Sequence, residues 1–106
     1  MADLSPEDQK LVTLARATMA RTRAAEGAAV RDLDGRTYAA AAVSLEHLTL
    51  SALDVCVAMA FSSGSSGLEA AVRLGGLDEP DLAAVHEFGG PDVVVHLGDA
   101  RGEMAG

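Results

Sequence analysis

The sequence has little from which cross-links or aromatic surfaces are built. Its 106 residues include one cysteine, no tryptophan, one tyrosine and two phenylalanines. Because a disulfide needs two cysteines, the single Cys56 excludes an internal disulfide bond. It lies within an apolar run, where a free cysteine is typically a small buried hydrophobic residue rather than a reactive thiol. The three scattered aromatic residues, Tyr38, Phe61 and Phe88, provide no platform for stacking nucleobases.

Basic residues are also scarce. Eight Lys and Arg stand against sixteen Asp and Glu, which gives a net charge of −8 and a pI near 4.6. Phosphate groups are bound by dense Lys and Arg, so this balance argues against a nucleic-acid partner and an anionic membrane surface. Hydrophobic residues make up 49% of the chain, far more than in a disordered acidic tail. At this length we expect one folded domain over residues 1–106.

Long hydrophobic runs and several common functional motifs are missing. No run reaches the ~18 apolar residues that span a bilayer, and the acidic start lacks a stretch of signal-peptide length, so we expect a cytoplasmic protein. The glycines between positions 64 and 76 form no phosphate-binding motif. His47 would lie one helical turn from Ser51, but no G-x-S-x-G elbow surrounds that serine. His86 and His96 have no partner at metal-ligand spacing and are expected at the surface or in packing contacts.

Hydrophobic periodicity and turn residues predict seven elements in the order α-β-β-α-β-α-β. Ser5 and Pro6 are typical of a helix start, and Asp34-Gly35 is typical of a hairpin turn. The predicted elements are a helix over 6–23, strands over 27–31 and 36–43, a helix over 48–62, a strand over 68–74, a helix over 79–88 capped by Asp78, and a strand over 92–97. Strands separated by helices favour an α/β fold with a sheet covered on both faces.

The helix predicted over 48–62 is apolar on nearly every side. One stripe consists of Leu50, Leu53, Val57 and Phe61, and alanine, valine, cysteine and methionine occupy the other faces. A helix that is apolar all round is normally buried all round. A domain of this size can cover one face with its sheet, so we expect a partner chain to cover the other. Asp54 is the only charge in the helix; pairing across an oligomer contact, surface exposure and a ligand contact are all open.

These elements resemble a known family, the small homo-oligomeric cytidine deaminases. Glu26-Gly27-Ala28-Ala29 and Asp34-Gly35 are similar to the family's V-G-A-A and d-G around its first hairpin. The family's apolar helix starts with C-A-E-R, and counting back from its A-x-x-x-G end at residues 60–64 places that motif on residues 51–54. The second zinc segment, P-C-x-x-C-R-Q-x-L-x-E-F, is anchored on Glu87-Phe88, which places its two cysteines on Asp78 and Asp81.

The resemblance covers residues 10–104 and implies a three-layer α-β-α fold with a mixed sheet. Ser51, Leu53, Asp78 and Asp81 are then the degenerate equivalents of the zinc cysteines and the catalytic glutamate. The family's ribose-binding Asn and Glu fall near Ala42 and Ser44. The candidate ligand-binding residues are therefore Ala42, Ser44, Ser51 and Asp78.

Those substitutions remove the groups that deamination requires. Hydrolytic deamination of cytosine uses zinc to lower the pKa of a bound water and a carboxylate to move protons. Zinc favours sulfur and nitrogen ligands; Ser51 cannot replace a thiolate at neutral pH, and Leu53 cannot carry a proton. Two aspartates are too few for a magnesium or calcium site. We therefore expect no zinc cofactor, no metal site and no catalytic residue.

Three hypotheses follow for the function. The first is a catalytically inactive, cytidine deaminase-like protein that assembles as a homodimer or homotetramer through residues 50–61. It would retain binding of a nucleoside-like ligand or of a protein. The alternative is a divergent cytidine deaminase acting on cytidine or deoxycytidine with a rewired metal site, in which Asp54 or Asp81 is the acid/base. The third is a structural accessory to another protein, with no small ligand.

Overall fold

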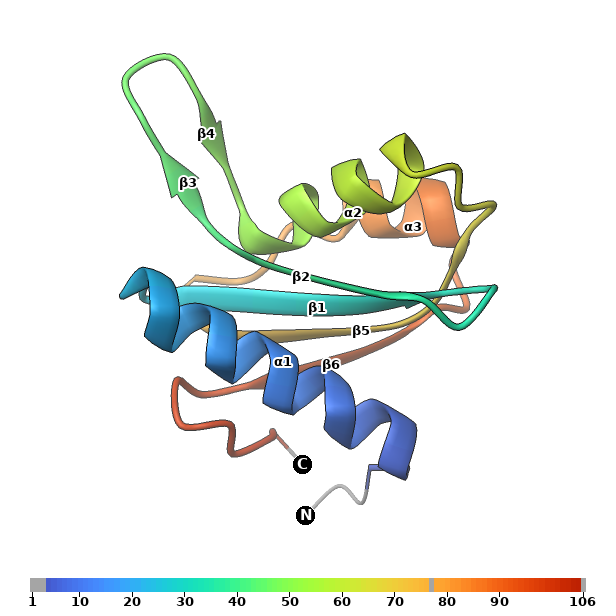
Figure 1. The fold of residues 1–106 in the computed structure, drawn as a ribbon, viewed down its shortest axis with the longest axis horizontal. Helices are drawn as coiled ribbons and strands as arrows, with labels where there is room; N and C mark the ends of the chain where they lie inside the picture. The colour runs from blue at the N-terminus through green and yellow to red at the C-terminus, as the bar shows by residue number, and fades with distance from the viewer. Residues whose placement is uncertain (1–3, 77, 106) are drawn as a thin grey trace.

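A computed structural model of the chain describes residues 4–76 and 78–105 (Figure 1). The structure confirms the element order predicted from the sequence, and it adds one short hairpin that was not predicted. The elements are α1 (Pro6–Thr22), β1 (Glu26–Asp32), β2 (Thr37–Ala41), β3 (Val43–Ser44), β4 (Thr49–Leu50), α2 (Ala52–Ser62), β5 (Leu68–Gly75), α3 (Ala83–Gly89) and β6 (Val94–Gly98). Among the described residues, no helix is both long enough and apolar enough to cross a bilayer.

The main sheet is mixed and lies between two layers of helix. Its strand order is β2-β1-β5-β6, with β1 antiparallel to both neighbours and β5 parallel to β6. Figure 1 shows α1 on one face of this sheet and α2 and α3 on the other. The predicted three-layer α-β-α fold with a mixed sheet is therefore confirmed.

Side-chain alternation along the strands divides the core into two clusters. In β1, Ala28 and Val30 pack in the cluster under α2, while Ala29 packs in the cluster under α1. Successive side chains of a strand point to opposite faces, so a run of small apolar residues can be buried on both sides. This explains why the alanine-rich segments form central strands, although alanine by itself favours helix.

Helix α2 starts later than predicted, because residues 43–50 form a hairpin. Strands β3 and β4 pair antiparallel, and the amide of Leu45 donates to the carbonyl of Leu48 at 2.8 Å. Figure 1 shows this hairpin projecting away from the main sheet. Ser51 then caps α2, and its Oγ accepts from the amide of Asp54 at 3.1 Å. His47 is therefore an exposed hairpin residue and not a helical neighbour of Ser51.

The apolar stripe predicted in α2 is divided, because Leu53 is buried in the core and Phe61 is exposed. The buried residues of the helix are Ala52, Leu53, Cys56 and Ala60. Small side chains on this face let the helix lie close to the alanine-rich strands, whereas Phe61 is 69% exposed on the outside. The prediction that Cys56 is buried is confirmed, and burial raises the pKa of its thiol to about 12.

Helix α3 also starts later than predicted, at Ala83 rather than at residue 79. Pro80 disfavours helical backbone in the residue before it, which delays the start. The prediction that Asp78 caps this helix is wrong. The Oδ1 atom of Asp81 instead accepts from the amide of Ala83 at 2.9 Å.

Candidate functional site

The four positions that resemble the zinc ligands and the catalytic glutamate meet in one small cavity. Ser51 and Leu53 line it from the start of α2, and Asp78 and Asp81 line it from the segment before α3. The cavity volume is about 110 Å³. Small-molecule sites typically occupy about 300–1,000 Å³, so a whole nucleoside does not fit inside it.

Three of these four side chains either hold the first turn of a helix or pack in the core. The Ser51 hydroxyl caps α2, and the Asp81 carboxylate holds the first amide of α3. Leu53 is only 2% exposed and belongs to the core under α2. The position that corresponds to the catalytic glutamate is thus an apolar part of the core.

The cavity also contains an ion pair that the sequence analysis missed. Nε of Arg73 in β5 donates to Oε2 of Glu26 in β1 at 2.9 Å, and the two side chains are 6% and 16% exposed. The antiparallel register places Arg73 opposite Ala28, so its side chain shares the α2 face with Glu26. Two sequence signals were available. Glu26 replaces the valine of V-G-A-A, and Arg73 is a charge on an inward position of an apolar strand.

This pair connects three segments of the chain. The other oxygen of Glu26, Oε1, accepts from the amide of Ala52, the first residue of α2, at 3.1 Å. Nη2 of Arg73 donates to Oδ1 of Asp78 at 2.9 Å, and both Nη atoms donate to the Asp78 carbonyl at 3.2 Å. Gly76 bends around the guanidinium with φ +76°, and a Cβ there would collide with Nη2.

The residues of the cavity do not fit the zinc ion that the resemblance implies. A serine hydroxyl and carboxylates offer oxygen atoms only, whereas zinc sites of this class use sulfur and nitrogen. The guanidinium of Arg73 also engages the carboxylates of Glu26 and Asp78, so these two groups are not free to ligate a cation. Within residues 4–76 and 78–105, no three His, Cys, Asp or Glu side chains are arranged to hold a metal.

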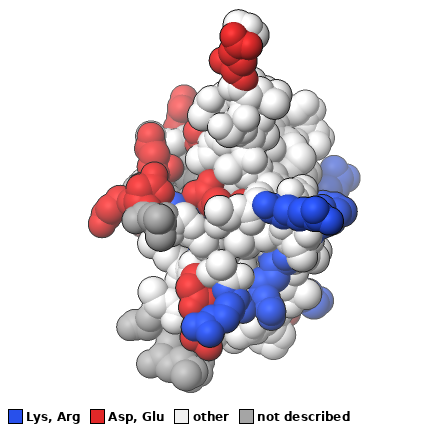
Figure 2. All heavy atoms as spheres, turned by 90° about the vertical axis from the view of Figure 1, so that its left-hand side faces the viewer, with Lys and Arg blue, Asp and Glu red and all other residues white. Residues whose placement is uncertain are grey.

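The rim of the cavity is acidic. The carboxylates of Glu26, Asp78, Glu79 and Asp81 surround a single guanidinium, that of Arg73. Figure 2 shows several acidic side chains gathered at the upper left of this end of the molecule, with basic side chains at the right and below. Such a rim repels phosphate and other anions.

A family model described as cytidine deaminase-like matches residues 4–102. The chain belongs to the cytidine deaminase-like family. Among curated proteins, no sequence matches it.

Solved structures of cytidine deaminases are similar to this deaminase-like chain over most of its length. The enzyme from Burkholderia pseudomallei has a TM-score of 0.75 at 22% identity, covering 96% of this chain and 91% of that one. The enzyme from Mycobacterium tuberculosis has a TM-score of 0.65 at 25% identity, covering 90% and 85%. The enzyme from Mycobacterium leprae has a TM-score of 0.65 at 20% identity, covering 97% and 93%. These likenesses support the same α/β fold.

The other candidate ligand residues of this deaminase-like chain lie apart from the cavity. Ala42 and Ser44 are exposed where β2 leads into β3, and neither lines it, whereas Ser51 and Asp78 do. Asp54 lies in a different hollow, a groove of about 440 Å³ between α2 and α3. The rings of Phe61 and Phe88 meet edge to face in that groove, with centroids 5.6 Å apart.

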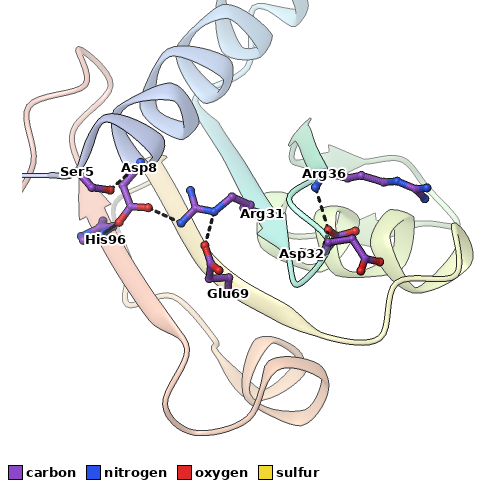
Figure 3. Close-up of polar contacts among 8 residues, drawn as sticks. Ser5, Asp8, Arg31, Asp32, Arg36, Glu69 and His96 are labelled. Atoms are coloured by element: carbon purple, nitrogen blue, oxygen red, sulfur yellow. Dashed lines mark hydrogen bonds and ion pairs between the residues drawn. The ribbon is translucent and has the colours of Figure 1, made fainter.

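A buried carboxylate joins the first hairpin to the loop before β5. Oδ1 of Asp32 accepts from the amide of Arg36 (Figure 3) and from that of Asp34, each at 2.9 Å. Oδ2 accepts from the hydroxyls of Tyr38 and Ser65. Burial by itself raises the pKa of Asp32, but these hydrogen bonds outweigh it and hold the pKa below 3.8. The aspartate is therefore an ionised structural acceptor.

A second carboxylate attaches α1 to the sheet. Asp8 pairs with Nη2 of Arg31 and with Nε2 of His96, each at 2.8 Å, and Nε of Arg31 also binds Glu69 (Figure 3). Burial by itself raises the pKa of Asp8, but hydrogen bonds from Arg31 and His96 and their charges hold the pKa below 3.8. His96, expected at the surface or in packing, thus holds α1 on β6.

Because the pKa values of Asp8 and Asp32 are lowered in the folded protein, we expect the free energy of unfolding to fall in acid. A group whose pKa is lower in the folded state contributes its full stabilisation above its unfolded value, here 3.8, and loses it as the pH falls through the folded value. The urea midpoint should therefore be steady near pH 6 and decline below about pH 4. Asp8→Asn should show a shallower decline, and an unchanged wild-type midpoint between pH 6 and 2.5 would contradict the prediction.

Proposed function

We propose that this cytidine deaminase-like chain is a single-domain, homo-oligomeric protein that does not deaminate cytidine. It retains binding of a protein or of a neutral nucleoside-like ligand, of which only a part enters the old pocket. One observation carries the proposal. The cavity that corresponds to the zinc site is occupied by Leu53 and by the ion pair of Arg73 with Glu26. Neither supplies a water activated by metal nor a free carboxylate for proton transfer.

The available carboxylates also support an inactive site. Both oxygens of Glu26 already accept hydrogen bonds, from Arg73 and from the amide of Ala52. Asp81 is engaged by the amide of Ala83, and Asp54 lies in the groove rather than in the cavity. A divergent deaminase that used Glu26, Asp54 or Asp81 as its acid/base would need that group to leave its present partner or place.

Elemental analysis tests the proposal against the divergent deaminase. Protein purified from cells grown with added zinc should contain far less than one zinc per chain, and the absorbance of cytidine and deoxycytidine should be unchanged on incubation. Near-stoichiometric zinc together with loss of that absorbance would establish the divergent deaminase instead. A thermal-shift series separates ligand binding from a purely structural role. Cytidine or uridine should raise the melting temperature, whereas cytidine monophosphate should not, because of the acidic rim.

The outward face of α2 supports self-association. Val57, Ala58 and Phe61 line the groove with Phe88, and Phe61 is largely exposed. The nearby hairpin adds two exposed leucines, Leu45 and Leu48. Apolar surface of this kind on adjacent elements favours a protein contact, and the resemblance to homo-oligomeric enzymes favours a second copy of this chain as the partner.

Phe61→Glu should break this assembly without unfolding the chain, because the Phe61 side chain is already exposed. Loss of a central aromatic at an interface typically costs about 2 kcal/mol or more, which raises the dissociation constant by roughly 30-fold. Sedimentation velocity over a range of concentrations measures the change. Leu33→Glu is the matched control, since Leu33 is exposed in the turn after β1 and outside the groove. A monomeric wild type, or equal effects of both variants, would contradict the prediction.

A further inference from the structure

We propose that the guanidinium of Arg73 replaces the zinc ion as the cation that holds the start of α2 and the segment before α3 together. In the family pattern, the zinc ligands fall on residue 51 and on residues 78 and 81, so the metal ties these two segments to each other. The inference rests on the proposed function, because a bound zinc would already supply this link.

The hydrogen bonds of Arg73 reach the same two segments. Its Nη atoms bind the carbonyl and the carboxylate of Asp78 directly. Its Nε binds Glu26, whose second oxygen binds the amide of Ala52 at the start of α2. Glu26 is thus an intermediate anion between the cation and the N-terminal end of a helix, where negative charge is favoured.

The surroundings of Arg73 indicate a built site rather than a surface charge. A buried charge is tolerated only when it is paired and hydrogen-bonded, and Nε, Nη1 and Nη2 each have an acceptor. Gly76 has a backbone conformation that favours glycine and lies directly against the guanidinium. The chain therefore closes around the cation, as it would around a metal ion.

A second arginine on the same sheet offers a control. Arg31 has a comparable side-chain exposure of 12% and two carboxylate partners, but it lies on the opposite face and holds α1 through Asp8. Loss of Arg31 should loosen α1 and leave the cavity unchanged. The two arginines separate the specific role of Arg73 from the general effect of removing a buried guanidinium.

Amide hydrogen exchange in Arg73→Met tests the link. We expect the amides of Ala52 and Ala83 to exchange at least about tenfold faster than in the wild type, because both segments lose their shared anchor. In Arg31→Met both amides should keep their wild-type rates. Unchanged rates in Arg73→Met, faster exchange at only one of the two segments, or the same pattern in Arg31→Met would overturn the proposal.

If Arg73→Met does not fold, Arg73→Lys supplies the measurement. Lysine keeps the positive charge but lacks the two Nη donors that hold Asp78. Exchange should then rise more at Ala83 than at Ala52. An equal rise at both segments, or none at either, would overturn the proposal.

Zinc grafting tests whether the ion pair occupies the place of the metal. The first variant, Ser51→Cys/Asp78→Cys/Asp81→Cys, restores the ligands and keeps Arg73. The second adds Glu26→Val and Arg73→Val. We expect near-stoichiometric zinc only in the second. Equal zinc content in both, including none in either, would overturn the inference. The proposed lack of deamination has a separate test, because it fails if the wild type holds zinc and consumes cytidine.

Discussion

Asp32→Ala is expected to lower the free energy of unfolding by about 3 kcal/mol or more, because it leaves several donors without their charged acceptor. Asp32 is 1% exposed, and its carboxylate accepts from two backbone amides and two hydroxyls. Those donors come from the β1–β2 hairpin and from the loop before β5, so their loss loosens two parts of the fold at once. Urea denaturation at pH 7 measures the change.

Two further variants isolate the cause. Asp34→Ala removes an exposed carboxyl from the same turn, and surface changes of this kind usually stay within about 0.5 kcal/mol. Tyr38→Phe removes one of the four donors and should cost about 1 kcal/mol. If Asp32→Ala is no more harmful than Asp34→Ala, the buried carboxylate does not contribute the stability assigned to it.

The elements that could be predicted from the sequence are those with local signals. Helix α1 has a serine cap and a proline at its first position, and the β1–β2 hairpin has an Asp-Gly turn. Such signals act within a few residues and need no tertiary contact. The same signals aligned the sequence with the family pattern, because the alignment rests on the hairpin and on the ends of the helices.

The errors arose where a distant contact or a weak turn decides the structure. The β3–β4 hairpin has strands of two residues and a Glu46-His47 turn, with neither glycine nor asparagine to mark it. The sequence left open which face of α2 is buried, because that depends on how closely the helix can approach strands of alanine. The buried face combines Leu53 with the smaller Ala52, Cys56 and Ala60.

The centre of the candidate site could be predicted only in part. Ser51, Leu53, Asp78 and Asp81 were identified through the family pattern, and they do share a cavity. The ion pair that fills it depends on the register of β1 against β5, which joins residues 47 positions apart. Strand register of this kind is set by the whole sheet, so the position of Arg73 relative to Glu26 does not follow from either segment alone.

Leu53→Glu, which restores the residue type of the family's catalytic glutamate, should lower the free energy of unfolding at pH 7 by about 3–5 kcal/mol. Leu53 is nearly fully buried, and the cavity beside it already holds four carboxylates and one guanidinium. The new carboxylate would be buried next to like charges without a partner of its own. Urea denaturation of Leu53→Glu and of its neutral isostere, Leu53→Gln, measures the part of the loss that is due to charge.

The pH dependence of that loss and a second-site variant identify its source. Burial and like charges raise the pKa of a carboxyl above its unfolded value, so Leu53→Glu should be least stable at high pH and regain stability as the pH falls. Glu26→Gln/Leu53→Glu should recover part of the loss at pH 7, since Arg73 would lose one carboxylate partner and gain another. Equal stability of Leu53→Glu and Leu53→Gln at pH 7 would contradict this account. If both the loss and its recovery in the double variant are observed, the pair of Arg73 with Glu26 opposes a glutamate at position 53, because that glutamate is tolerated only after its competitor for the guanidinium is removed.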